Sequence, residues 1–239
     1  MLKIKNRKDY LLALKARDRK IKRNQLRYYR PYIKQAEFHK AGLAHRERLF
    51  MAGNQLGKTL AGGMEIAMHL TGLYPDWWNG RRFDGPTRGW AAGVTGESTR
   101  DNPQRILVGP PSQESAWGTG TIPGDTILST DRARGVPNLL DNIIVKHVTG
   151  GDSHLAFKAY EKGREKWQGE TLDFVWFDEE PPPDIYSEGL TRTTAHMGIV
   201  LVTFTPLLGM SEVVRMFIND SQQKEMKEGY PYQKRVRGR

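Results

Sequence analysis

The alternation of apolar and polar positions predicts strands and helices that follow one another along the chain. A short apolar run from Arg48 to Ala52 indicates a strand. A helix fits residues 58–71 and is closed by Gly72, because glycine commonly ends a helix. Its apolar side chains recur at helical spacing and are expected to pack in a core: Leu60, Met64, Ala67 and Met68.

The second half of the chain is predicted to be mostly strand. Apolar runs predict strands at 89–95, within 172–180 and within 197–206. Residues 142–148 and 153–160 flank Gly150-Gly151-Asp152, which is a hairpin signal. Residues 108–137 are rich in Gly, Pro, Ser and Thr and are expected to be irregular. Strands that alternate with helices predict an α/β fold with a mainly parallel sheet.

The N-terminal end is predicted to be helical and strongly basic. A helix fits residues 8–29 and ends before Pro31, and a short one follows at 35–41. Residues 1–50 hold 16 Lys and Arg against 4 Asp and Glu, whereas the whole chain holds 37 against 27. This asymmetry favours a polyanionic partner, with nucleic acid preferred over a membrane. A solvated basic helix without a partner stays open as the alternative.

Composition excludes several classes of protein. The 239 residues, 38% hydrophobic and 27% charged, can bury a core. The absence of cysteine excludes disulfide scaffolds, cysteine nucleophiles and thiolate metal sites, and it fits a reducing compartment. No apolar run approaches the roughly 20 residues of a membrane span, and no signal peptide is recognisable. We therefore expect a soluble intracellular protein.

The stretch AGNQLGKT between the first strand and its helix fits a phosphate-binding loop with alanine in the first glycine position. In such a loop backbone N–H groups converge on an anion, and a glycine lets the backbone approach a phosphate. Lys58 would reach the β- and γ-phosphates, and the Thr59 hydroxyl would face Mg²⁺. A turn that carries a surface lysine is the alternative. The expected ATP-binding residues are Gln35, Ala52, Gly53, Asn54, Gln55, Leu56, Gly57, Lys58 and Thr59.

The run FVWFDE supplies the second half of such a site. Four apolar residues precede Asp178, which would hold the Mg²⁺ shell, and Glu179, which would polarise the attacking water of an ATPase. Glu180 is the weaker candidate for the base and can instead orient the prolines that follow. A strand that ends in surface acids is the alternative, and the phosphate loop earlier in the chain argues against it.

Three further features leave their alternatives open. Gln35 would read the adenine edge through its amide, or it is an ordinary surface glutamine. Thr203 and Thr205 would sense the γ-phosphate and couple it to movement, or they are a β-branched strand end. Arg164 would serve as an arginine finger, or it is a solvent-facing arginine.

Together these blocks resemble the large terminase subunit of tailed bacteriophages and prophages. The resemblance lies in PYIKQAEFHKAGLAHRERLFMAGNQLGKT, GREKWQGETLDFVWFDEEPP and LVTFTPLLGMSEVVRMF, and it covers residues 29–218. It implies a RecA-like P-loop NTPase fold with an additional strand (the ASCE class), a mainly parallel sheet flanked by helices. It also implies ATP-driven translocation of double-stranded DNA into a procapsid, in the cytoplasm of the bacterial host.

The resemblance also implies cofactors, partners and roles for single residues. ATP and Mg²⁺ are the expected cofactors. Portal and small terminase subunit are the expected partners, together with further copies in a ring, and a monomer in isolation is the alternative. Lys58 and Thr59 match the phosphate loop, Asp178 and Glu179 the acids, and Gln35 the adenine-reading glutamine. The segment Thr203 to Thr205 matches the coupling motif.

Two departures from the family pattern concern arginine and length. Gln168 stands where some relatives place an arginine that acts across subunits, and the phosphate loop has no internal arginine. The relatives continue into a metal-dependent nuclease domain, for which the residues after Thr205 are too few. We therefore expect a basic helical segment at 1–30, an ATPase domain at 31–220, a basic tail at 221–239, and no DNA cleavage by this chain.

The sequence therefore predicts an ATP-hydrolysing motor domain that translocates DNA. Another DNA-dependent P-loop ATPase, such as a helicase, is the first alternative, but a helicase needs a second RecA-like lobe that this length does not hold. A non-catalytic DNA- or assembly-binding module with a vestigial nucleotide site is the second alternative. The joint presence of Lys58, Thr59, Asp178 and Glu179 argues against it.

Overall fold

The structure, a computed structural model, describes residues 7–205 and 211–217. It contains seven strands: β1 (Glu47–Met51), β2 (Arg88–Gly93), β3 (Ile127–Arg132), β4 (Leu140–Lys146), β5 (Asp152–Ala159), β6 (Phe174–Asp178) and β7 (Ile199–Phe204). The α-helices are α1 (Arg7–Arg23), α2 (Gln25–Tyr28), α3 (Ile33–Ala41), α4 (Lys58–Thr71), α5 (Gly96–Thr99), α6 (Arg105–Val108), α7 (Pro183–Thr194) and α8 (Glu212–Phe217). Shorter turns of other helix types are η1 (Arg100–Gln104), η2 (Glu114–Ala116), η3 (Tyr160–Lys162) and η4 (Arg164–Trp167).

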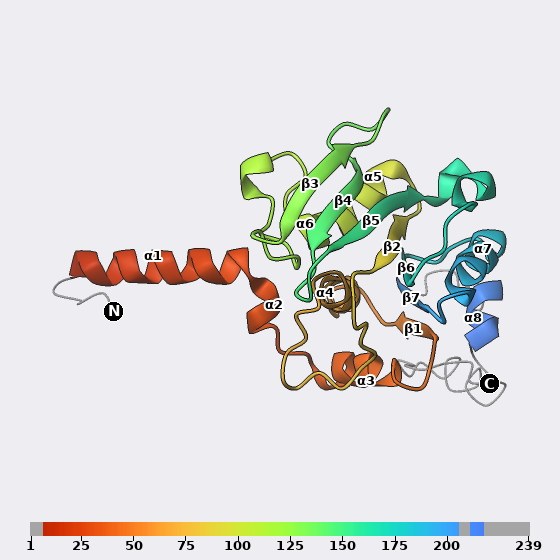
Figure 1. Cartoon of the computed structure of the whole chain (residues 1–239), viewed down its shortest axis with the longest axis horizontal. Helices are drawn as coiled ribbons and strands as arrows, with labels where there is room; N and C mark the ends of the chain where they lie inside the picture. Colours follow the sequence, from red (N-terminus) through yellow and green to blue (C-terminus); the bar gives the residue numbers. More distant parts are fainter. Residues whose placement is uncertain (1–6, 206–210, 218–239) are drawn as a thin grey trace.

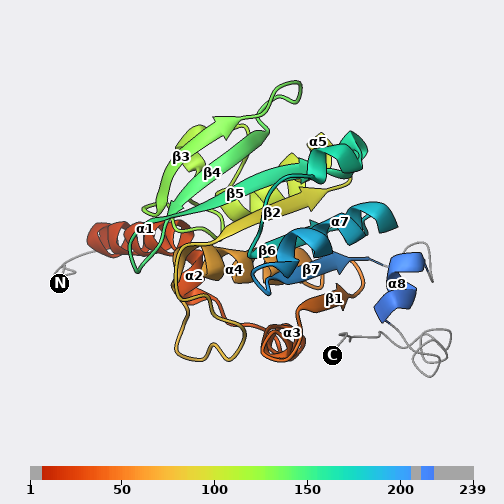
Figure 2. The same cartoon turned by 45° about the vertical axis from the view of Figure 1, so that its right-hand side comes forward.

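The described strands form one sheet in the order β1-β7-β6-β2-β5-β4-β3, which runs from bottom to top in Figure 2. Strands β1, β7, β6, β2 and β5 are parallel, and β4 and β3 continue the sheet antiparallel. The predicted mainly parallel sheet is therefore confirmed. Because β7 lies between β1 and β6, the sheet has the additional strand that the resemblance implies.

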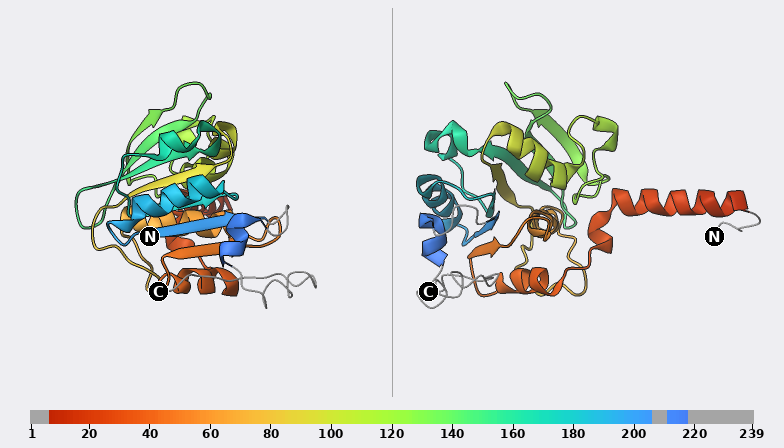
Figure 3. Two further views of the ribbon diagram at one scale, coloured as in Figure 1. Left: turned by 90° about the vertical axis from the view of Figure 1, so that its right-hand side faces the viewer. Right: turned by 180° about the vertical axis from the view of Figure 1, so that it is seen from behind.

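Two hydrophobic cores cover the two faces of the sheet. Successive residues of β6 alternate between them, because neighbouring side chains of a strand point to opposite faces. Phe174 and Trp176 join the core built around α4, whereas Val175 and Phe177 join the core that includes α7 and α8. Figure 3 shows α5 and α6, in yellow-green, covering the sheet when it is seen from behind. The result is a sheet between two helical layers.

Helix α4 has the predicted bounds, and Gly72 ends it in the left-handed conformation with φ 71°. Its burial is more complete than an apolar stripe predicts, because every residue from Ala61 to Thr71 is buried. These include Glu65 and His69, both fully inaccessible. The helix is therefore a central element of the core, and it begins at the phosphate loop.

The predicted helix at 8–29 is interrupted. Asn24 ends α1 and caps α2, because its side chain accepts a hydrogen bond from the N–H of Arg27 at 3.1 Å. Helix α1 has no buried residue and extends away from the body of the protein (Figure 1). Among the described residues, no helix combines the length and apolar character that crossing a membrane requires.

Two segments depart from the sequence expectation. The irregular stretch 108–137 contains β3, an edge strand whose polar residues and partial exposure hide the strand pattern. Helix α7 was not predicted, since three prolines precede it and Gly189 interrupts its apolar pattern. The predicted tail at 221–239 and the last residue of the 197–206 run lie outside the described residues, as do residues 1–6 of the basic segment.

Candidate active site

The segment after β1 has the geometry of an anion-binding loop. Residues 53–56 are exposed and lead directly into the first turn of α4. Gln55 and Gly57 have φ of 61° and 74°, and glycine takes this left-handed conformation without strain. The loop and the helix N-terminus therefore present backbone N–H groups at one place. Nothing in the sequence pattern alone showed that Gln55 is also left-handed.

Lys58 is held at the loop rather than in solvent. Its side chain is buried and its Nζ donates to the carbonyl oxygen of Gly53 at 2.9 Å. Burial lowers its pKa, and the charges of Glu179 and Asp178 oppose this shift. The ammonium therefore lies within the field of both acids, which a surface lysine on an unrelated turn would not do.

Gln35 bridges the chain before the loop to the loop itself. Its Nε2 donates to the carbonyl oxygen of Gly57 at 2.9 Å, and its Oε1 accepts from the N–H of Tyr32 at 2.9 Å. The side chain is 2% exposed, so it is not an ordinary surface glutamine. The structure shows it holding the phosphate loop. Its reading of an adenine edge stays a prediction.

The acids at the end of β6 meet the first turn of α4. Asp178 is buried, and its Oδ1 accepts hydrogen bonds from the hydroxyls of Thr59 at 3.0 Å and Thr203 at 2.8 Å. Burial raises the pKa of Asp178 to about 7, against the lowering effect of these bonds. Burial also raises the pKa of Glu179, opposed by the Thr205 backbone N–H and by Lys58. Cationic ligands would relieve the cost of ionising both acids.

This convergence comes from parallel pairing. The carboxyl ends of β1, β7 and β6 meet at the same edge of the sheet, so that residues far apart in sequence become neighbours. Thr203 is the register partner of both Phe50 and Asp178. Thr205 donates to Asn54 in the phosphate loop at 2.9 Å. The two predicted coupling threonines therefore contact the acid and the loop respectively.

Residues 49–234 match the protein family described as terminase large subunit, T4likevirus-type, N-terminal. The chain belongs to the large terminase subunits of phages. The region it matches is their N-terminal, ATPase region.

Three similar proteins place this terminase chain among known ones. The terminase large subunit of Salmonella phage P22 is 42% identical over 233 residues, which cover 90% of this chain and 47% of that protein. The crystal structure of the HK97 bacteriophage large terminase has a TM-score of 0.50 and 11% identity, covering 76% of this chain and 34% of that one. The large terminase of a thermophilic bacteriophage in complex with ADP has a TM-score of 0.43 and 12% identity, covering 83% and 50%.

The similar proteins differ in what they show about this one. The terminase chain spans about half the length of the curated P22 relative that it matches. At 11% identity, the likeness to the HK97 protein shows the fold alone. The roles of the site residues therefore rest on the geometry of this chain.

Arg164 lies apart from the acids. Its Nε donates to Glu188 on α7 at 2.9 Å, and its side chain is 57% exposed. Arg192 contacts the same carboxylate at 2.9 Å. Gln168 is exposed on the segment that follows. The structure thus does not bring Arg164 to the phosphate loop of its own chain, and a role across subunits stays a prediction.

Three neighbours of the acids were not expected from sequence. Trp176 donates from its Nε1 to the hydroxyl of Thr203 at 2.8 Å, which orients that hydroxyl toward Asp178. Ser211 donates to the carboxylate of Glu180, just before α8. Tyr160, at the end of the predicted strand 153–160, contacts the backbone of both acids. Its position at the carboxyl end of a parallel strand was the only sequence signal.

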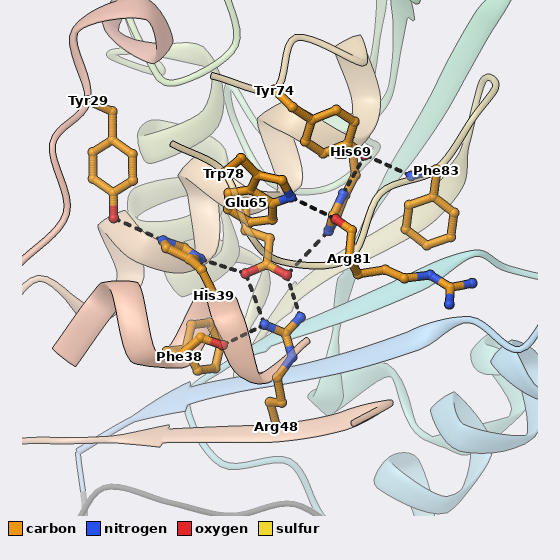
Figure 4. A network of polar contacts seen from close by, with 10 residues as sticks. All are labelled: Tyr29, Phe38, His39, Arg48, Glu65, His69, Tyr74, Trp78, Arg81 and Phe83. Atoms are coloured by element: carbon orange, nitrogen blue, oxygen red, sulfur yellow. Dashed lines mark hydrogen bonds and ion pairs between the residues drawn. The ribbon is translucent and has the colours of Figure 1, made fainter. Parts of the chain in front are cut away.

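A buried charge network lies behind the loop (Figure 4). Glu65 on α4 is fully inaccessible and binds both terminal nitrogens of the Arg48 guanidinium on β1. It also contacts His39 at 2.7 Å and His69 at 3.3 Å. Each imidazole faces a tyrosine hydroxyl with its other nitrogen: Tyr29 at 3.1 Å and Tyr74 at 2.9 Å. The strand and helix on either side of the phosphate loop are thus joined to α3, which carries Gln35.

Proposed function

We propose that this chain binds ATP at the 52–59 loop, hydrolyses it with the acids at the end of β6, and drives double-stranded DNA into a procapsid. One observation carries the proposal. Thr59, the second residue of α4, donates to Asp178 at the end of β6, and Lys58 beside it interacts with both Asp178 and Glu179. A phosphate cradle and two acids at one place are the parts that ATP hydrolysis requires.

Each residue has a distinct role in this proposal. The loop N–H groups and Lys58 would bind the phosphates and fix the γ-phosphoryl group in place. The half-buried carboxylate of Glu179 would accept a proton from the attacking water, since its raised pKa makes it a better base than an exposed glutamate. The phosphate-binding loop of Ala52 to Gly57 has no arginine of its own.

The residues present fit a magnesium ion. Hydroxyl and carboxylate oxygens, those of Thr59 and Asp178, converge in a buried place where the acid has a raised pKa. Among the described residues no group of three or more His, Cys, Asp or Glu side chains could hold a metal by itself. This suits Mg²⁺, which takes most of its ligands from water and phosphate. When bound, the ion would neutralise charge on the phosphates.

The partners follow from the family and from charge. Support for DNA comes from α1, which carries eight basic and two acidic residues and buries none of them. We further propose portal, small terminase subunit and further copies in a ring as partners, in the cytoplasm of the bacterial host. The division into segments 1–30, 31–220 and 221–239 is part of the same proposal.

The decisive experiment is ATP hydrolysis with and without double-stranded DNA, on wild type, Glu179→Ala and Lys58→Ala. Turnover that Glu179→Ala abolishes while ATP binding persists supports the proposal, and Lys58→Ala should lose binding as well. No wild-type turnover at high protein concentration contradicts it and favours a non-catalytic binding module. High concentration matters because a finger supplied by a neighbouring subunit acts only after assembly.

A further inference from the structure

Tyr160 holds the backbone of the two acids from beneath. It follows β5 directly, is 5% exposed, and packs its ring against Trp167 and Phe177. Its hydroxyl donates to the carbonyl oxygens of Asp178 at 3.1 Å and Glu179 at 2.9 Å. Burial raises the pKa of Tyr160 well above its ordinary value, so the hydroxyl stays protonated and remains a donor.

Glu179 occupies a conformation that needs this support. Its φ is 71°, in the left-handed region, which costs a residue with a side chain about 1–2 kcal/mol. Its N–H donates to the carbonyl oxygen of Thr203 at 2.8 Å. The residue is thus held by β7 at its N–H and by Tyr160 at its C=O. This turn takes the chain out of the β6 course at the position where the carboxylate interacts with Lys58.

We propose that Tyr160 is a positioning residue for ATP hydrolysis: its hydroxyl fixes the left-handed turn at Glu179 and so sets where the general base lies. The inference rests on the proposed function, because it assigns a role within the same site. The hydroxyl touches backbone carbonyls alone among the groups of the two acids, so it acts through Glu179 and not on the nucleotide. Tyr160 also begins the segment that carries Arg164, which places the two side chains on one short stretch of chain.

The chain offers a matched control in Tyr186. Its ring also lies 6.0 Å from that of Phe177, in the same core, and it is 1% exposed. Its hydroxyl donates to Glu47 at 2.6 Å, at the opposite end of the strands from the acids. Tyr160→Phe and Tyr186→Phe each remove one buried hydroxyl from the same core. A purely structural role for Tyr160 predicts equal effects.

The first test measures kcat, ATP affinity and melting temperature for both variants. We expect Tyr160→Phe to lower kcat at least about 10-fold, the scale of a small misplacement of a catalytic group, while ATP affinity stays within about 2-fold. Tyr186→Phe should keep wild-type kcat with a similar loss in melting temperature. Wild-type kcat in Tyr160→Phe, or a loss no larger than in Tyr186→Phe, overturns the inference.

A second test needs no turnover. Glycine adopts φ 71° without strain, so Glu179→Gly should remove the conformational need for the hydroxyl. We expect the melting-temperature loss caused by Tyr160→Phe to shrink by about half or more in the Glu179→Gly background. Additive losses overturn the inference. If the wild type hydrolyses no ATP, the proposed function fails, and this cycle still decides whether Tyr160 holds Glu179.

Discussion

The hydroxyl of Thr203 lies 2.8 Å from the carboxylate oxygen of Asp178 that also accepts from Thr59. One oxygen thus joins the end of β7, the end of β6 and the first turn of α4. Because β7 leads directly into Thr205, which contacts Asn54 in the loop, a shift of this strand would change the acid and the loop together. This contact supports the predicted coupling role of both threonines.

Thr203→Val should uncouple the acid from β7. The substitution keeps the shape but removes the donor to Asp178 and leaves the Trp176 Nε1 without its acceptor, at a cost of about 1–3 kcal/mol in unfolding free energy. We expect kcat to fall at least about 10-fold with ATP binding retained, in a steady-state assay. Thr193→Val is the control, because Thr193 is equally buried on α7 and bonds only backbone carbonyls and Arg46 there. Equal turnover in the two variants would contradict the prediction.

Gln35→Ala should weaken nucleotide binding by loosening the phosphate loop. It removes the donor to the Gly57 carbonyl, a hydrogen bond worth about 1 kcal/mol, or about 5-fold in affinity. The expected loss is the same for ATP and GTP, measured by calorimetry with both nucleotides. A loss confined to ATP would show instead that the amide reads the adenine base.

Glu65→Gln should destabilise the fold by about 3 kcal/mol at neutral pH, because it leaves the buried Arg48 guanidinium without its counter-charge. Chemical denaturation of wild type and variant measures this difference. Arg48→Met with Glu65→Leu removes both charges and should recover part of the loss. A Glu65→Gln variant as stable as wild type would contradict the role of the network.

The same network predicts acid sensitivity. Burial raises the pKa of Glu65, but Arg48, His39 and His69 together lower it further, so that it lies well below its ordinary value. Its stabilising contribution is therefore complete above the unfolded pKa of about 4.3 and is lost as pH falls toward the folded value. The difference in unfolding free energy between wild type and Glu65→Gln should narrow below about pH 4.3. A difference that stays constant through further acidification would contradict this.

Arg164→Ala should have little effect on stability, below about 1 kcal/mol, since its partner Glu188 keeps Arg192 and Arg164 itself is largely exposed. If it acts across subunits, turnover falls at least about 100-fold at concentrations where the chain assembles. Mixing Arg164→Ala with Glu179→Ala should then restore part of the activity, because each supplies what the other lacks. Arg192→Ala serves as the control, and no recovery on mixing rejects the finger.

Deletion of residues 1–20 should weaken DNA binding and leave ATP binding unchanged. The cut lies before Arg23, whose backbone and side chain contact Gly124 and Ser115. Since α1 buries no residue, its removal should not harm the core. The slope of log affinity against log salt should fall by about 0.9 for each DNA phosphate that the shortened chain no longer neutralises, measured by fluorescence anisotropy. Unchanged affinity after the deletion would remove α1 from the DNA interface.

Local chemistry in the sequence determined the elements of the phosphate site. Gly57 and Gly72 bracket a helix whose bounds were predicted because glycine is the residue that tolerates the conformations at its two ends. The apolar run before Asp178 could be assigned to a buried strand for the same local reason. The edge strand β3 and helix α7 could not be assigned, since polar residues and prolines weaken the periodic pattern there.

The sequence by itself determined the residues of the cradle and the acids, because each motif is a short run whose spacing carries its chemistry. Only the tertiary structure decided how they meet: that Thr59 and Thr203 share one oxygen of Asp178, that Gln35 holds Gly57, and that Arg164 faces α7. It also decided that Tyr160 supports a strained Glu179. The physical reason is parallel pairing, which brings strand ends that are distant in sequence to one edge of a sheet and leaves no trace in the local pattern.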